Sequence, residues 1–259
     1  MLTTWHGRTV LVTGGTRGIG LACGLAFGKL GARAVLTHKW GSADETTIFE
    51  AFAAADAPRP EIIAADVSYP ADTVSLMQSL KSLCDGIDVF ISNAAVAQVV
   101  QGTEDYQRRN LMKSMDYTTW PLIDYTFAIK DAFAKYPRYV IAMSSLGPDQ
   151  YFSGYDFVAT SKAALETLAK YLSRRLRQEG CRVNILRAGL VSTDSLASVF
   201  GQERVAAALQ LRPECFVSPD DVAGAAVGLC SGWMDAVNGQ TITVDRGASF
   251  TFASEFVGF

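Results

Sequence analysis

Three glycines near the start of the sequence have the spacing of a phosphate-binding turn. The short apolar run Val10 to Val12 is followed by TGGTRGIG at residues 13–20, and a helical pattern of apolar residues begins at once. The first glycine permits a tight turn, the second lets the backbone approach a pyrophosphate, and the third lets a helix pack against the strand. The amide groups and positive dipole end of that helix attract phosphate. We therefore expect a dinucleotide to bind the loop residues Gly14, Thr16, Arg17, Gly18, Ile19 and Gly20.

The end of the next apolar run indicates which dinucleotide binds. Sites that prefer NAD usually place an acidic residue there, where it holds the ribose 2′-hydroxyl. Residues 34–40 instead read AVLTHKW, so His38 and Lys39 stand where the acid would be. Lys39, together with Arg17 in the glycine loop, can neutralise a 2′-phosphate. The sequence therefore predicts NADPH as the cofactor, with Lys39 as a solvated loop lysine as the alternative interpretation.

Short apolar runs alternate with longer helical stretches along the whole chain, and these elements must position the loop. The runs are β-branched or continuously apolar, as expected for strands buried on both faces. Such alternation favours a parallel sheet with right-handed crossovers. We predict an α/β fold, a Rossmann-type doubly wound parallel sheet of about seven strands with helices on both faces. The expected strands are 9–13, 34–37, 61–65, 89–92, 139–144, 182–186 and 241–244, and the expected helices include 18–30, 70–83, 116–135 and 155–178.

The chain is expected to form one domain over residues 1–259. Its length suits one large α/β domain, and no Pro/Ser-rich linker or internal repeat divides it. Two stretches, 41–60 and 193–219, are expected to be surface loops or small insertions. The second follows the sixth strand, where a substrate lid would lie.

Composition argues against several classes of partner. The 23 Lys and Arg residues against 26 Asp and Glu residues give a net charge of -3, so nothing suggests nucleic acid or a basic membrane-surface segment. The five cysteines form no C-x-x-C pair and only two histidines are present, so we expect no metal site and reduced thiols. The sequence has no signal-peptide pattern and no apolar run of membrane length. A cytoplasmic protein is expected.

Further segments resemble the short-chain dehydrogenase/reductase family, in the right order and over nearly the whole chain. The glycine spacing GxxxGxG at residues 14–20 is the first of them, and NGQTITVDRG at 238–247 is the last. The resemblance implies that Asp66 and Val67 contact the adenine. It also implies that two further segments contact the cofactor. The first lies beside it, at Asn93, Ala94 and Ala95, and the second meets the nicotinamide carboxamide, at Gly189, Val191 and Thr193.

The same resemblance points to a candidate active site on the helix predicted over 155–178. The family pairs a serine with Y-x-x-x-K; here Lys162 is in place, but Val158 occupies the usual tyrosine position. Tyr155 lies three residues earlier, and this longer spacing resembles the enoyl-acyl-carrier-protein reductases. Seven residues are almost two helical turns, so Tyr155 and Lys162 can share a helix face. Ser145 stands at the family's catalytic serine position.

Two other departures from the family pattern bear on the reaction. Asp116 and Tyr117 stand where the ordinary reductases carry an asparagine, and enoyl reductases also tend to lack it. Ser145, however, stands where many enoyl reductases carry a second tyrosine. The resemblance thus implies an NADPH-dependent reductase of enoyl thioesters in fatty-acid or polyketide-like metabolism, while reduction of a β-ketoacyl group or other ketone stays open. A third hypothesis, suggested by Val158, is an NADPH-binding protein without catalysis.

In the implied mechanism, Tyr155 hydrogen-bonds the thioester oxygen as enolate charge develops, and Ser145 holds the carbonyl or a water. Lys162 binds the nicotinamide ribose hydroxyls and favours tyrosinate character nearby. Tyr151 is the rival for the substrate oxygen, and Tyr155 as a packing residue is the other alternative. The resemblance also implies a homotetramer or homodimer acting on a small-molecule or acyl-carrier-bound thioester.

Overall fold

All seven predicted strands are present, and they form one parallel sheet. The structure, a computed structural model, describes residues 4–39 and 43–250. Within these residues the sheet has the strand order β3-β2-β1-β4-β5-β6-β9, and each boundary lies within two residues of its predicted position. The strands are β1 (Thr9–Val12), β2 (Arg33–His38), β3 (Glu61–Ala64), β4 (Val89–Ser92), β5 (Tyr139–Ser145), β6 (Arg182–Ala188) and β9 (Thr241–Val244).

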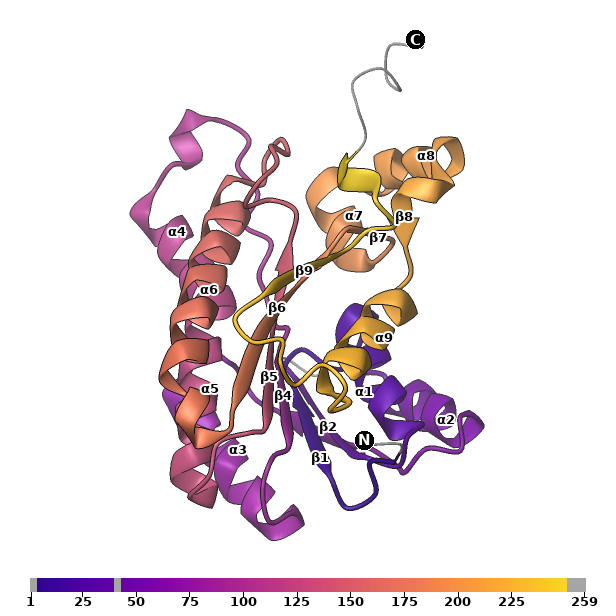
Figure 1. The fold of residues 1–259 in the computed structure, drawn as a ribbon. Coiled ribbons are helices and arrows are strands. Elements are labelled where there is room, and N and C mark those ends of the chain that lie inside the picture. Colours follow the sequence, from indigo (N-terminus) through magenta and orange to yellow (C-terminus); the bar gives the residue numbers. More distant parts are fainter. Residues whose placement is uncertain (1–3, 40–42, 251–259) are drawn as a thin grey trace.

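Helices cover both faces of the sheet, as Figure 1 shows. Successive side chains of a strand point to opposite faces, so Val10 and Val12 join one core while Leu11 joins the other. The first core lies under α1 (Gly18–Gly28), α2 (Glu45–Ala54) and α9 (Pro219–Cys230), and the second under α3 (Pro70–Leu83), α5 (Trp120–Phe133) and α6 (Asp156–Arg175). The predicted doubly wound Rossmann-type fold is confirmed.

The strand order reverses between β1 and β4, which are neighbours in the sheet although β2 and β3 separate them in sequence. In open α/β sheets, ligands bind in the crevice outside the carboxyl ends of the strands at such a switch point. The glycine loop follows β1 and Asn93 follows β4 directly. The fold therefore brings two of the predicted cofactor segments to this one point.

The stretch 41–60, expected as a surface loop or small insertion, contains the helix α2 and is therefore not a plain loop. Asp44 caps the helix by accepting a hydrogen bond from the Thr47 amide at 3.2 Å. Ile48 and Phe52, one turn apart, are buried in the core. Only two of the ten residues of α2 are buried, so the local pattern is too weak to identify the helix from the sequence.

The stretch 193–219, which we call the lid, also folds into helices rather than a loop. It contains α7 (Asp194–Phe200) and α8 (Gln202–Leu211), which lie beyond the carboxyl end of the sheet (Figure 1). A short parallel pair of strands, β7 (Leu190–Val191) and β8 (Phe216–Val217), closes its base. No residue of α7 or α8 is buried, so neither helix is anchored in a core of the sheet.

The helix expected over 116–135 begins as a π-helical turn, η2 (Met115–Thr119), which follows α4 (Arg108–Ser114) and leads into α5. Pro121 lies in the first turn of α5, and proline lacks the amide that would continue a regular ladder back into the preceding turn. Such π-helical turns often occur at functional sites.

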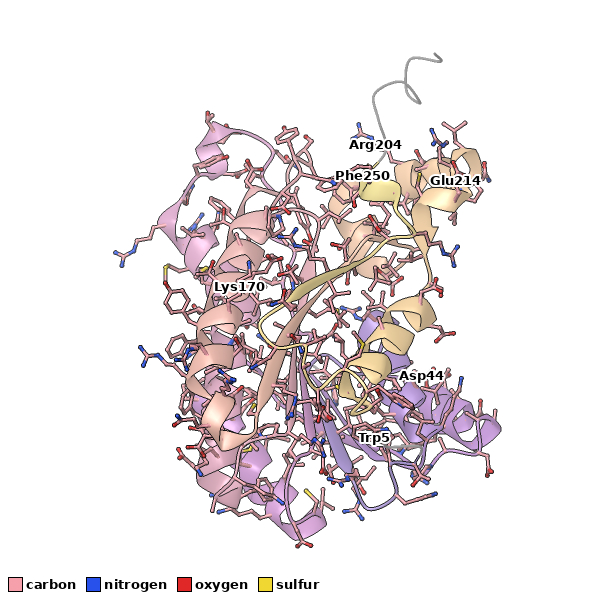
Figure 2. The ribbon with its side chains drawn as sticks, in the orientation of Figure 1. Trp5, Asp44, Lys170, Arg204, Glu214 and Phe250 are labelled. Carbon is pink, nitrogen blue, oxygen red and sulfur yellow. The ribbon has the colours of Figure 1, made fainter. Side chains whose placement is uncertain are left out.

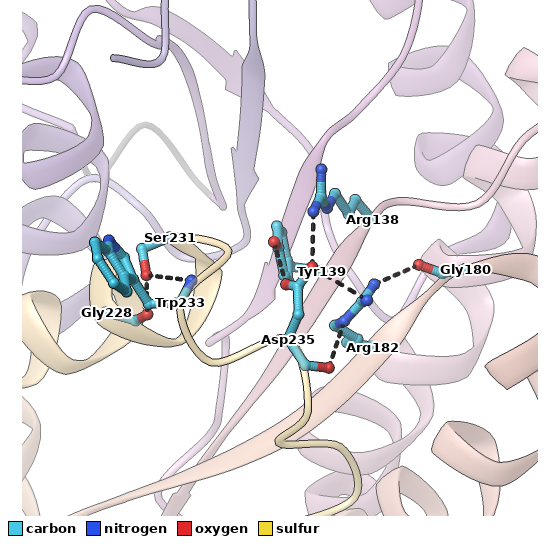
Figure 3. Close-up of polar contacts among 8 residues, drawn as sticks. All are labelled: Arg138, Tyr139, Gly180, Arg182, Gly228, Ser231, Trp233 and Asp235. Atoms are coloured by element: carbon cyan, nitrogen blue, oxygen red, sulfur yellow. Dashed lines mark hydrogen bonds and ion pairs between the residues drawn. The ribbon is translucent and has the colours of Figure 1, made fainter. Parts of the chain in front are cut away.

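Polar and aromatic contacts hold the amino-terminal ends of the strands, at the opposite end of the sheet from the glycine loop. The Asp235 carboxylate accepts hydrogen bonds from Arg138 at 2.8 Å and from the Tyr139 hydroxyl at 2.6 Å, and it lies 3.1 Å from Arg182 (Figure 3). Trp5, at the same end (Figure 2), is 1% exposed and packs edge-on against Phe27 at 4.9 Å. No helix among the described residues is both long and apolar enough to cross a membrane.

Candidate active site

The glycine loop has a backbone that only glycine accommodates. Gly14 has a φ of +60°, and a Cβ placed there would lie 3.2 Å from the Ala94 Cα. A Cβ on Gly20 would lie 2.3 Å from the Gly14 carbonyl oxygen. The start of α1 therefore packs directly on the turn that precedes it, as the sequence predicted for a phosphate-binding loop.

Asn93 fastens this loop to the end of β4. Its Nδ2 donates to the carbonyl oxygens of Thr13 and Gly14, each at 3.0 Å. In return, the Thr13 hydroxyl accepts the backbone amides of Asn93 at 3.1 Å and Ala94 at 3.2 Å. The predicted cofactor residues Asn93 and Ala94 are thus brought against the glycine loop, while Ala95 is exposed beside them.

The first turn of α1 is suited to an anion. Arg17 occupies the N-cap position in an extended conformation, and no side chain of the described residues caps the helix. The amide groups of such a turn, with the positive end of the helix dipole, are a site for phosphate. Thr16 is buried in the same turn and Ile19 packs against the core below it. These residues fit the pyrophosphate of a dinucleotide.

A pocket of about 220 Å³ lies at the carboxyl ends of β2 and β3, where the adenosine half of the dinucleotide is expected. It is lined by His38, Lys39, Ala64, Ala65, Asp66, Tyr69 and Asp72. The Asp66 amide is fixed by the Asp72 carboxylate at 2.8 Å. Val67 is buried in the core against α3 rather than lining the pocket.

Lys39 is engaged in contacts that the sequence did not reveal. Its ammonium forms an ion pair with Asp66 and a hydrogen bond to the Tyr117 hydroxyl. Burial acts to raise the pKa of Asp66, but the hydrogen bonds from Lys39 and Ser68 outweigh it and hold that pKa below its usual value. The predicted phosphate ligand therefore stands beside a carboxylate in this structure.

Tyr155 lies at the start of α6, in the N-cap position, and Val158 lies one turn further on. Val158 is only 4% exposed and packs in the interior. Burial raises the pKa of Tyr155, and a hydrogen bond with the Ser145 side chain opposes that rise. Ser145 ends β5, and Gly147 donates its amide to the Ser145 hydroxyl at 3.4 Å. The structure thus brings Tyr155 and Ser145 together, while Tyr151 is 85% exposed.

Lys162 is buried two turns along α6 from Tyr155. Its ammonium donates to the Met143 carbonyl oxygen at 2.6 Å, at the end of β5. Burial lowers the pKa of Lys162 to about 8, against the opposing charge of Glu166.

Glu166 and Arg187 form a buried ion pair beneath the site that sequence reasoning missed. Two bonds of 2.7 Å join the guanidinium to both carboxylate oxygens, and the Ser144 hydroxyl donates to Glu166 at 2.7 Å. Arg187 also pairs with Asp149 in the loop that leads to Tyr155. No spacing in the sequence indicates this pair, since β6 reads RVNILRA and carries Arg182 and Asn184 as well as Arg187.

The lid reaches the candidate tyrosine through an aromatic contact. The ring of Phe200, the last residue of α7, stacks on Tyr155 with centroids 6.0 Å apart and planes at 26°. Phe152 completes the group at 6.1 Å from Tyr155 and 6.0 Å from Phe200. Two aromatic rings therefore pack against the Tyr155 ring, and one of them comes from the lid.

The remaining predicted cofactor residues lie at the base of the lid. The Gly189 amide donates to Val244 at 2.9 Å, and a Cβ there would lie 2.7 Å from the Asp245 Cβ. Val191 is buried. The Thr193 hydroxyl accepts the Leu196 amide at 3.3 Å as the cap of α7, and its methyl group would lie 3.4 Å from a Cβ on Gly18. The lid therefore starts beside the glycine loop.

A glycine loop between β1 and α1, at the switch point of a doubly wound parallel sheet, defines a nucleotide-binding protein of the Rossmann class. Residues 14–249 match the sequence model of a family described as enoyl-(acyl carrier protein) reductase. The chain belongs to the short-chain dehydrogenase/reductase family, in this enoyl-reductase-like branch, and is an oxidoreductase with a nicotinamide cofactor. The resemblance found in the sequence is confirmed.

Two relatives and one solved structure illustrate the similarity. 3beta-hydroxysteroid dehydrogenase 1 of Eggerthella lenta is 31% identical over 252 residues, which cover 93% of each chain. Enoyl-(acyl-carrier-protein) reductase (NADH) FabI of Aquifex aeolicus is 26% identical over 256 residues, 93% of this chain and 91% of that protein. The crystal structure of a variant of actinorhodin polyketide ketoreductase with NADPH superposes with a TM-score of 0.84 at 20% identity, over 97% of this chain and 99% of that one.

Proposed function

We propose that this protein is an NADPH-dependent reductase that saturates the double bond of an enoyl thioester. The observation that carries the proposal is the placement of Tyr155, two turns from Lys162 and beside Ser145, with Val158 packed in the interior. This placement supports Tyr155, the tyrosine at enoyl-reductase spacing, as the residue that serves the site. The description of the matching family and the similarity to FabI support the same reaction.

The residues divide the work of the reaction. The reduced nicotinamide supplies hydride chemistry when bound, directed at the β-carbon of the thioester. Negative charge then develops on the thioester oxygen, and the Tyr155 hydroxyl donates a hydrogen bond to it, stabilising charge that exists mainly in the transition state. Lys162 keeps its positive charge near the phenol and offers donors to the nicotinamide ribose. The Ser145 hydroxyl positions the phenol through the hydrogen bond between the two side chains.

NADPH is the proposed cofactor because His38 and Lys39 replace the acidic residue expected for NAD at the end of β2. Arg17 stands in the glycine loop, at the N-cap position of α1. The guanidinium and the ammonium together supply the charge that a 2′-phosphate requires. We further propose one domain over residues 1–259, a homotetramer or homodimer, and a thioester carried on a small molecule or a carrier protein, with the lid over its acyl chain.

The test is NADPH oxidation at 340 nm with crotonyl and acetoacetyl thioesters side by side. Wild type is expected to turn over the crotonyl thioester, and Tyr155→Phe is expected to lose about 10²-fold in rate, as for a lost oxyanion partner or proton donor. Tyr151→Phe is the matched control and should retain its rate. Equal loss in both variants, or turnover of the ketone alone, would show that the proposal is wrong.

A second candidate is reduction of a ketone. The contact between Ser145 and Tyr155 favours it, because a serine hydroxyl beside the phenol can hold a carbonyl oxygen directly. The similarity to 3beta-hydroxysteroid dehydrogenase 1 points the same way. Ser145→Ala separates the two reactions: a loss of about 10²-fold is expected for a carbonyl substrate, and a much smaller loss for an enoyl thioester.

A further inference from the structure

Three side chains from distant parts of the chain meet at the adenosine pocket. Lys39 comes from the residue after β2, Asp66 from the segment after β3, and Tyr117 from the π-helical turn η2. The Lys39 ammonium contacts both the Asp66 carboxylate and the Tyr117 hydroxyl, and that hydroxyl donates to Asp66 Oδ2 at 3.1 Å. Each group therefore touches the other two.

The two oxygens of Asp66 have different partners. Oδ1 accepts the amide and the hydroxyl of Ser68, at 2.9 and 2.8 Å. Oδ2 is shared between Lys39 and Tyr117. The Lys39 ammonium also lies 4.5 Å from the centroid of the Tyr117 ring. The ring and the hydroxyl of Tyr117 thus make separate contributions, and a phenylalanine would keep the first and lose the second.

We propose that Tyr117 is a specificity-determining residue for the 2′-phosphate, because its hydroxyl retains Asp66 when the Lys39 ammonium turns to the phosphate. This inference rests on the proposed assignment of Lys39 as a phosphate ligand. The Tyr117 hydroxyl already donates to Oδ2, so the carboxylate keeps a donor on each oxygen after Lys39 has moved. Tyr117 lies in the middle of the π-helical turn η2.

Charge explains why the effect is confined to NADPH. A 2′-phosphate brings negative charge next to Asp66 and draws Lys39 away, which leaves two like charges close together. A hydrogen bond from Tyr117 to Oδ2 then offsets the repulsion, since a bond to an ionised acceptor is stronger than one between neutral groups. NADH carries a neutral 2′-hydroxyl, so the Lys39–Asp66 pair stays closed and Tyr117 has nothing to replace.

The experiment measures the affinity of the full-length protein for NADPH and NADH by titrating the cofactor fluorescence. Tyr117→Phe is expected to weaken NADPH binding about tenfold, which is about 1.4 kcal/mol, and to leave NADH binding within about twofold. Tyr171→Phe is the matched control. It removes a hydroxyl from a tyrosine of α6 that is 68% exposed and does not line the adenosine pocket, and both affinities should stay unchanged.

A second measurement keeps the test independent of any loss of folding. In an Asp66→Asn background there is no carboxylate charge to hold, so adding Tyr117→Phe should have no further effect on the ratio of the two affinities. A tenfold effect that persists in that background, or equal weakening of NADPH and NADH by Tyr117→Phe, would overturn the inference.

Lys39→Ala distinguishes this inference from the function on which it rests. If Lys39→Ala weakens NADPH selectively while Tyr117→Phe does not, the cofactor assignment stands and the role of Tyr117 is wrong. If Lys39→Ala leaves the ratio of NADPH to NADH affinity unchanged, the cofactor assignment fails, and the inference about Tyr117 fails with it.

Discussion

Burial acts in opposite directions on the two titratable side chains of the candidate site. It raises the pKa of Tyr155 and lowers the pKa of Lys162 to about 8. The neutral phenol and the ammonium are therefore both present at pH 7. This is the pair of forms in which the phenol can donate a hydrogen bond to a developing oxyanion while a cation favours the charge transfer.

The first prediction at this scale is a loss of activity above about pH 8. Lys162 in the folded protein is a cation below its lowered pKa of about 8, whereas the unfolded chain keeps that proton up to the ordinary value of 10.5. Between these values the unfolded chain binds more protons, so folding is not weakened there by Lys162 as pH rises. The pH profile of kcat/KM should therefore fall through about pH 8 while the protein stays folded.

Glu166→Gln supplies the matched variant for this pH profile. The Glu166 charge opposes the effect of burial on Lys162, so its removal should lower the pKa of Lys162 further and move the falling limb to lower pH. Asp149→Asn is the control, because it breaks the other ion pair of Arg187 without changing the charge next to Lys162. Equal shifts in the two variants would assign the effect to Arg187 and contradict the prediction.

The residues that support the site were the hardest to predict from the sequence. Tyr155, Lys162 and the glycines carry a spacing along the chain, and the structure brings them to one end of the sheet. Arg187, Glu166 and Asp149 have no such spacing, because their contacts join β6, α6 and a loop that are separate in sequence. Lys39 was identified as a phosphate ligand, but its contacts with Asp66 and Tyr117 could not be predicted. They depend on how segments that are distant in sequence pack together.

At the scale of elements, strands and long helices were predictable and short capped helices were not. Strands such as β1 and β4 are buried on both faces, so their sequences are continuous apolar runs that need no partner to be recognised. The helix α8 has no buried residue, and α2 buries only two. Their formation depends on caps such as Asp44 and on neighbouring elements, which a local pattern does not contain.

The start of α6 gives the prediction at this scale. Val158 is 4% exposed, so Val158→Tyr must force a ring into a filled interior, which should reduce the free energy of unfolding by about 1–3 kcal/mol. The new tyrosine should not restore activity when it is added to Tyr155→Phe. Denaturant unfolding and the 340 nm assay check the two parts.

Val158→Ile is the control for that variant, because it enlarges the side chain by one methylene without adding a hydroxyl. It should cost less stability than the tyrosine and leave activity intact. Full stability of Val158→Tyr together with recovered turnover in the Tyr155→Phe background would mean that position 158 faces the site after all.

At the scale of the whole molecule, the candidate site and a set of stabilising polar contacts lie at opposite ends of the strands. The candidate site lies at the carboxyl ends, whereas the Asp235 contacts tie together the amino-terminal ends of β5 and β6 (Figure 3). Burial acts to raise the pKa of Asp235, but hydrogen bonds from Tyr139 and Arg138 outweigh it and lower that pKa. Changes at one end should therefore affect stability without changing the chemistry at the other.

Asp235→Asn tests this separation. The variant should lose about 1–3 kcal/mol of unfolding free energy, since hydrogen bonds to a charged group are weakened, while kcat stays near that of wild type. A carboxylate with a lowered pKa stabilises the fold above its unfolded value of 3.8 and ceases to do so as pH falls through its folded value. The difference in unfolding free energy between wild type and Asp235→Asn should therefore disappear in acid. Asp131→Asn, an exposed carboxylate on α5, should show no gap at any pH.

The fastening of the glycine loop by Asn93 has a consequence for biosynthesis. The loop is complete in sequence once residue 20 has left the ribosome, but the side chain that holds the Thr13 and Gly14 carbonyls follows 80 residues after Thr13. Parallel strands that are distant in sequence pair slowly, because the loop between them must first close. A nascent chain therefore cannot bind the nucleotide at this loop before Asn93 has been synthesised and β4 has paired with β1. Cofactor binding during synthesis would report that these central strands have assembled.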